Sequence, residues 1–199
     1  EPQVAAWSIT PPRDQAAIDE LVDVFLESEG DMRAVMRKLL NAAFFKNARF
    51  ARVKSPGEFV AGVLKLSGGL REPTLTLGTL QGGMGAMGQK LMDPPSVEGW
   101  HTGKEWIDGG TLMERVNFAV DQVKDPSAPG TNSVAARLAN GGPLSVEELV
   151  DGCLDAMGPL EVSEETREAL LAGADDGDHE ARVARMLTLV VATPEYQFA

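Results

Sequence analysis

The stretch SVEELVDGCLDAM, which covers Ser145–Met157, has the most regular spacing of apolar side chains in the sequence. Its apolar positions recur every three or four residues, which places them on one face of an α-helix. Ser145 and Glu148 have the spacing of a capping box, in which a hydroxyl and a carboxylate bind free N–H groups of the first turn. The segment therefore predicts a helix with one buried face. That face consists of Val146, Leu149, Val150, Cys153, Leu154 and Met157.

The same helical spacing recurs before and after this stretch. Ser55 with Glu58 predicts a second capping box, Pro56 suits the first helical turn, and Gly68 predicts the end of that helix. The sequence thus predicts an all-α fold, a multi-helix globular bundle of eight or nine helices with a connecting loop rich in glycine, proline and tryptophan. The other predicted helical segments are residues 18–26, 32–40, 77–91, 112–123, 133–139, a segment after Ser163, and 183–190.

A domain boundary is predicted at Asp125–Gly130, where two prolines interrupt the helical pattern. On this basis residues 1–125 form a main helical domain and residues 126–199 form a C-terminal helical lobe. We expect the two to pack together as one unit.

The composition excludes several classes of protein. The net charge of −12 disfavours binding to nucleic acid, which depends on lysine and arginine. No apolar run is long enough to span a membrane. Cys153 is the single cysteine, so an internal disulfide and a cysteine-based zinc site are excluded, and its place in an apolar stripe predicts an inert buried thiol.

No cofactor and no metal are predicted. Residues 83–88, GMGAMG, match the GxGxxG pattern of dinucleotide-binding proteins, but Pro94 and Pro95 would cut short the helix that such a site requires. The glycines are better explained by helix packing. The two histidines, His101 and His179, lie far apart and in no metal-binding motif.

The stretch DPPSVEGWHTGKEWIDGG, residues 93–110, supports two interpretations. In the first it is a structural clasp, with buried tryptophans and capping boxes at Thr102 with Glu105 and at Thr111 with Glu114. In the second, carboxylates beside tryptophan rings bind or cleave a polysaccharide. The ligand-binding residues in that case would be Glu98, Trp100, His101, Glu105, Trp106 and Asp108.

Charge is unevenly distributed along the chain. Residues 145–180 hold twelve acids and one base, whereas residues 33–54 hold seven bases and no acid. Such runs are either solvated faces or, for the basic segment, a patch that binds an anion or a partner. The patch would comprise Arg33, Arg37, Lys38, Arg49, Arg52 and Lys54.

Several ordered motifs resemble the domain-of-unknown-function 1800 family. The resemblance implies a predominantly helical bacterial protein, of which this chain would be the C-terminal portion, and an exported or cell-envelope location by association. It supplies no catalytic residues. The motifs are KSP with EFV (residues 54–60), MGQ (87–89), PPSVEGW (94–100), EW (105–106), Leu112 with Arg115 and NFA (117–119), and ATPEYQF (192–198).

Together these observations predict a non-catalytic interaction or assembly module of a larger protein. Its partner would be another protein or the missing N-terminal region of the same chain. The alternative is a portion of a polysaccharide-binding or polysaccharide-processing enzyme that uses the Trp100 and Trp106 loop with Glu98, His101, Glu105 and Asp108.

Overall fold

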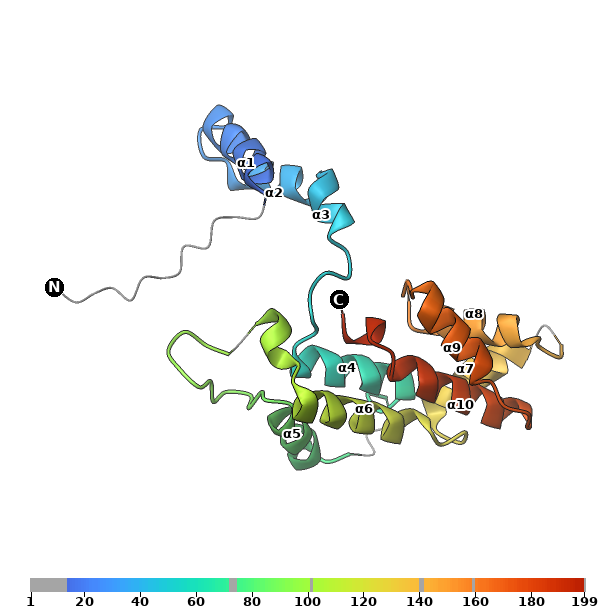
Figure 1. Cartoon of the computed structure of the whole chain (residues 1–199). Coiled ribbons are helices and arrows are strands. Elements are labelled where there is room, and N and C mark those ends of the chain that lie inside the picture. The colour runs from blue at the N-terminus through green and yellow to red at the C-terminus, as the bar shows by residue number, and fades with distance from the viewer. Residues whose placement is uncertain (1–13, 72–74, 101, 140–141, 159, 199) are drawn as a thin grey trace. The chain divides into compact units, whose positions relative to one another are not determined.

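The computed structural model describes residues 14–71, 75–100, 102–139, 142–158 and 160–198. Within them it contains ten α-helices, two short 3-10 helices and two isolated β-bridges, so the predicted all-α fold is confirmed. Figure 1 shows the helices in chain order. The contacts divide the chain into two compact units between Arg49 and Phe50. The additional boundary near Asp125 stays a prediction.

The N-terminal unit contains a helical hairpin and one short helix. Helix α1 (Gln15–Glu27) begins at Asp14, whose side chain accepts a hydrogen bond from the Ala17 N–H, and α2 (Met32–Asn41) begins at Asp31 in the same way. Gly30 joins them with a φ of 87°, a backbone conformation that glycine adopts without strain. Helix α3 (Ala43–Asn47) follows.

The second unit begins with α4 (Pro56–Ser67), where the predicted capping box of Ser55 and Glu58 is present and Gly68 ends the helix in the left-handed conformation. Helix α5 (Leu77–Ala86) begins at Thr76. The first four residues of the GMGAMG stretch lie in or at the end of this helix, and the described residues before it contain no strand. This arrangement differs from that of a dinucleotide-binding motif.

Helix α6 (Gly109–Val123) starts earlier than the sequence analysis predicts. The expected capping box of Thr111 with Glu114 is wrong, because Asp108 is the capping residue and its carboxylate accepts from the N–H groups of Gly110 (2.7 Å) and Thr111 (2.9 Å). The box of Thr102 with Glu105 is confirmed, but it begins a short 3-10 helix, η1 (Gly103–Trp106).

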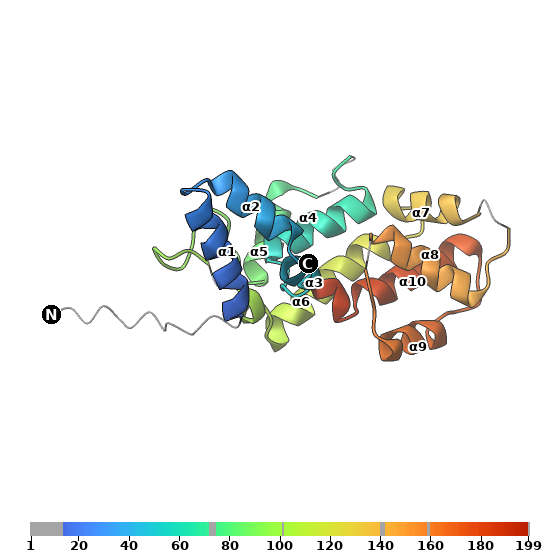
Figure 2. The same ribbon diagram turned by 90° about the horizontal axis from the view of Figure 1, so that it is seen from above.

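The remaining helices complete the core of the second unit. They are α7 (Pro129–Ala139), α8 (Val146–Ala156), α9 (Glu164–Ala172), α10 (His179–Val191) and the 3-10 helix η2 (Glu195–Gln197). Helix α10 contacts α6, α7, α8 and α9, and Figure 2 shows it among them. Its buried face explains this central position, because six of its residues are excluded from solvent: Val183, Ala184, Met186, Leu187, Val190 and Val191.

One close contact fixes α7 against the end of α4. The Cα of Gly130 lies so near the α4 backbone that an added Cβ would overlap the Leu66 carbonyl oxygen and the Ser67 carbonyl carbon. The segment that the sequence analysis interprets as a joint is therefore a site of tight packing. Among the described helices, none is both long enough and apolar enough to cross a bilayer.

Candidate functional site

The loop that contains the tryptophans is partly buried. Trp106 is 5% exposed, and Trp100 is half-buried with its indole N–H donating to the Lys90 carbonyl oxygen at 3.0 Å. Glu98 is exposed, and His101 lies outside the described residues. The ring of Trp106 packs 3.9 Å from the position that a Cβ on Gly88 would take. Both indoles thus have structural contacts.

The carboxylates of Glu105 and Asp108 act as helix caps. Glu105 accepts a hydrogen bond from the Thr102 N–H at 3.4 Å, and Asp108 caps α6. The backbone hydrogen bonds from Thr111 and Gly110 lower the pKa of Asp108. These contacts support the interpretation of the loop as a clasp, while the six-residue ligand site stays a prediction.

The six residues of the predicted basic patch belong to both units. Arg33, Arg37, Lys38 and Arg49 lie in the N-terminal unit, whereas Arg52 and Lys54 lie in the second. Two ion pairs neutralise part of this charge locally. Lys38 forms an ion pair with Glu20 (2.8 Å), and Arg52 forms one with Glu58 (2.6 Å). A single patch made by all six residues stays a prediction.

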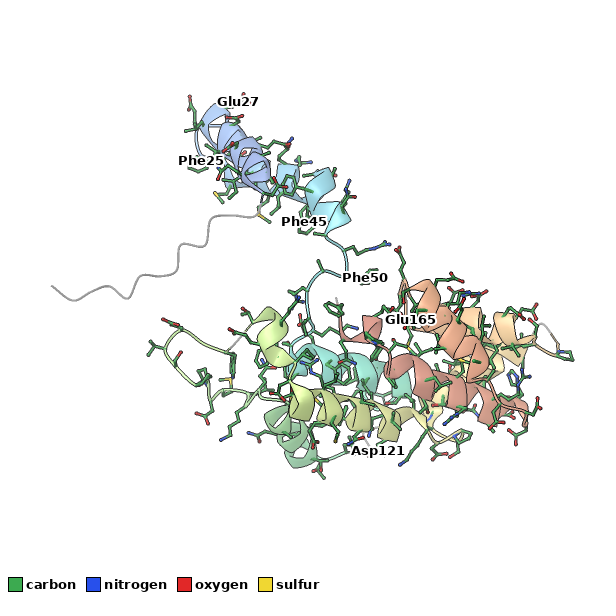
Figure 3. All side chains as sticks on the ribbon, viewed as in Figure 1. Phe25, Glu27, Phe45, Phe50, Asp121 and Glu165 are labelled. Carbon is green, nitrogen blue, oxygen red and sulfur yellow. The ribbon has the colours of Figure 1, made fainter. Side chains whose placement is uncertain are left out.

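The N-terminal hairpin exposes apolar side chains along both of its helices. Leu21, Val35 and Leu39 are half-buried, so they occupy the contact between α1 and α2. The more exposed residues form what we call the outer stripes, and Figure 3 labels Phe25 among them. Their exposed fractions reach 66% at Leu26 and 59% at Met32. The outer stripes are Ile18, Val22, Phe25 and Leu26 on α1, and Met32, Met36 and Leu40 on α2.

The second unit contains a group of polar residues that we call the Arg115 cluster: the buried Arg115 and Gln197, and the half-buried Lys54. Arg115 is 0% exposed, and its Nη2 donates to the Lys54 carbonyl oxygen at 2.9 Å. The Lys54 N–H donates to the Gln197 carbonyl oxygen at 2.8 Å, so the three residues are directly connected. The Lys54 Nζ donates to the Tyr196 carbonyl oxygen at 2.8 Å and lies 4.4 Å from the centre of the Tyr196 ring.

Several polar atoms of the Arg115 cluster have no partner. Arg115 Nε and Nη1 and both amide atoms of the Gln197 side chain are buried without a hydrogen bond. Nearly all buried polar groups in native proteins are bonded, so these atoms are candidates to bind a ligand or a water. The guanidinium of Arg115 also stacks 5.3 Å from the centre of the Phe59 ring, which is weak compensation for a buried charge.

Burial also shapes the electrostatics of the Arg115 cluster. Loss of solvation lowers the pKa of Arg115 and that of Lys54, while the charge of Glu58 partly opposes the change at Lys54. Glu58 is itself paired with Arg52. Within the described part of the chain, no carboxylate forms an ion pair with Arg115. The Arg115 cluster therefore retains an excess of positive charge.

A cavity of about 320 Å³ lies beside the Arg115 cluster. Gln197 is one of its lining residues, and Arg115 belongs to the same helix, α6, as the lining residues Leu112 and Val116. Most of the wall is apolar, and none of the ten lining residues is acidic. They are Val53, Lys104, Ile107, Leu112, Val116, Ala192, Thr193, Pro194, Gln197 and Phe198.

The Arg115 cluster was not predicted from the sequence. One signal was present, because Arg115 falls three residues after Leu112 and four before Ala119, on the apolar face of its helix. A lone arginine in such a stripe is expected to be buried and to need a partner. The role of Gln197 had no such signal, since it depends on contacts with residues about 140 positions earlier in the chain.

Fold and cavity together define an all-α protein with a candidate ligand pocket at the junction of α6 and the segment that follows α10. The chain belongs to the DUF1800 family, described as "Protein of unknown function (DUF1800)", whose family model matches residues 2–198. The resemblance seen in the sequence is therefore confirmed. No curated protein and no solved structure matches the chain.

Proposed function

We propose that this protein is a helical assembly module, and that the outer stripes of α1 and α2 bind a second copy of the chain. The observation that carries the proposal is the exposure of seven large apolar side chains on two short helices. Exposed apolar groups that are contiguous mark interaction surfaces in soluble proteins.

The N-terminal hairpin also lacks the burial that would stabilise it alone. Neither α1 nor α2 contains a fully buried residue. Segments below about 40 residues rarely bury enough apolar surface to be stable without oligomerisation or another aid. Two hairpins that pack their outer stripes together would form a four-helix bundle, which buries the apolar face of every helix.

The distribution of charge favours a second copy as the partner. Helix α1 carries four acids and no base, whereas α2 carries three bases and no acid. A two-fold axis would place α1 of one copy against α2 of the other, which brings opposite charges together at both ends of the contact. The three members of the predicted basic patch that lie on α2, Arg33, Arg37 and Lys38, would then serve self-association.

The test is the mass of the full chain in solution, measured by light scattering across a range of concentrations. We expect a dimer that dissociates on dilution. Val22→Glu and Met36→Glu place a charge in each outer stripe and should weaken the dimer at least about tenfold, the effect of about 1.4 kcal/mol. Circular dichroism would verify that the helices remain.

Val97→Glu is the matched control, because Val97 is an exposed apolar residue in the second unit. It should leave the dimer unchanged. A wild-type chain that is monomeric at every concentration would refute the proposal. So would a dimer that the two stripe variants and the control affect equally, because the contact would then lie elsewhere.

A further inference from the structure

We propose that the cavity beside the Arg115 cluster binds a small organic carboxylate with an apolar body. This inference is independent of self-association, because every residue involved belongs to the second unit. It is carried by three features of the cavity: its apolar walls, the unpartnered amide of one lining residue, and positive charge beside it.

The walls determine the body of the ligand. The cavity of about 320 Å³ lies at the lower end of the roughly 300–1,000 Å³ typical of small-molecule sites. Ile107 and Leu112 line it from the start of α6, and Pro194 and Phe198 line it from the segment after α10. A short aliphatic or alicyclic group would be desolvated on both sides there, and burial of its surface would drive binding.

The amide of Gln197 determines where the polar head binds. Gln197 is 3% exposed, it lines the cavity, and neither its Nε2 nor its Oε1 has a hydrogen-bond partner. A carboxylate oxygen placed in the cavity accepts from Nε2, and a water that enters with it can donate to Oε1. The ligand thereby satisfies a buried group that the protein leaves without a bond.

The surrounding charge selects an anion over a neutral molecule. Lys104 lines the cavity, and the Lys54 backbone next to lining residue Val53 accepts the hydrogen bond of Arg115. Lys104 is the one charged residue among the ten that line the cavity, none of the ten is acidic, and the Arg115 cluster adds positive charge beside it. In a site with apolar walls the effective dielectric constant is low, so these cations attract a carboxylate more strongly than they would in water.

The experiment compares octanoate with octan-1-ol, which has the same chain length and no charge. Isothermal titration calorimetry of the full chain should show one octanoate per chain and binding of octan-1-ol at least about tenfold weaker. Gln197→Leu removes both amide atoms at nearly constant volume and should weaken octanoate about tenfold to hundredfold, the usual effect of a lost hydrogen bond to a charged group. Gln81→Leu is the matched control, because Gln81 is an exposed residue of α5, and it should change nothing.

A second variant tests the charge. Arg115→Met keeps an apolar side chain of similar length and should abolish the preference for octanoate over octan-1-ol. If this variant fails to fold, Lys104→Gln on the exposed side of the cavity should reduce the same preference. In the wild-type protein, octanoate should also shift the side-chain amide resonances of Gln197 in the NMR spectrum.

Three results would overturn the proposal. The first is equal affinity for octanoate and octan-1-ol in the wild-type chain. The second is octanoate binding that Gln197→Leu leaves unchanged. The third is no binding at millimolar octanoate, which would mean that water alone satisfies the amide of Gln197.

Discussion

Replacement of Gly130 by alanine is the most direct test of how α4 and α7 pack. The backbone of Gly130 is not in the left-handed region, so alanine would be compatible with its φ. The obstacle is steric, because the new Cβ would overlap the Leu66 carbonyl oxygen and the Ser67 carbonyl carbon and would lie 2.7 Å from the Gly68 N. These are backbone atoms, which have no alternative rotamer to adopt, so the two helices would have to move apart.

The size of the effect follows from that geometry. Overpacking a close-packed interior costs about 1–3 kcal/mol, and contacts with backbone atoms belong at the upper end of that range. We therefore expect Gly130→Ala to lower the free energy of unfolding by about 3 kcal/mol. That is a large share of the roughly 5–15 kcal/mol that stabilises a typical domain.

Urea unfolding followed by circular dichroism measures this difference, with Gly62→Ala as the matched control. Gly62 lies inside α4 with no atom within 4 Å of its added Cβ, so alanine there should raise the free energy of unfolding by about 0.5–1 kcal/mol. If Gly130→Ala were as stable as the wild type, or more stable, the proposed close contact between α4 and α7 would be incorrect.

Three further measurements address other parts of the fold. The hydrogen bond from Arg52 lowers the pKa of Glu58 to about 2. The stability lost in Glu58→Gln should therefore be greatest above pH 4.5 and disappear as the pH falls to 2. Because this pair is exposed, chemical unfolding at several pH values should show a loss of about 1 kcal/mol or less in the free energy of unfolding. Loss of stabilisation only above pH 7 would contradict it. Ser145→Ala removes the cap of α8 and should lower the free energy of unfolding by about 1 kcal/mol in the same assay. Ser133→Ala is the control, because Ser133 is exposed inside α7, and it should change the stability very little. Equal effects of the two variants would refute the capping role. Burial raises the pKa of Cys153 to about 12, so a thiol reagent at pH 8 should label it at the rate of unfolding, and rapid labelling of the folded chain would contradict the structure.

Local chemistry accounts for what the sequence predicts correctly. The capping boxes at Ser55 and Ser145 each depend on residues within three positions of one another, and both are present. These signals depend on hydrogen bonds that any isolated helix start must satisfy. Helix caps of this kind can therefore be predicted without knowledge of the tertiary structure.

The start of α6 shows where such reasoning fails. Both Asp108 and Thr111 are good capping residues, and the sequence alone does not rank them. In the structure the Thr111 hydroxyl donates to the Trp106 carbonyl oxygen and also accepts from the Asp108 N–H, so it is already engaged and Asp108 becomes the cap. The hydrogen bond that decides which residue caps α6 is thus made with Trp106, in the loop before the helix.

The Arg115 cluster could not be predicted from the sequence for a different reason. The pattern of α6 places Arg115 on the buried face, but the identity of its neighbours depends on residues from both ends of the second unit. Likewise, the boundary between Arg49 and Phe50 interrupts a continuous basic segment that looks uniform in the sequence. Both features are properties of the folded contacts, which periodicity does not encode.

The hydrogen bond between Lys54 and Tyr196 spans 142 positions in the chain. At the roughly 5–20 residues per second of protein synthesis, a ribosome needs about 7–30 s to add that stretch. During this interval the Lys54 side chain is without the Tyr196 carbonyl oxygen to which it donates. The nascent polypeptide therefore presents the Lys54 ammonium group to solvent, or to a chaperone, until Tyr196 has been made.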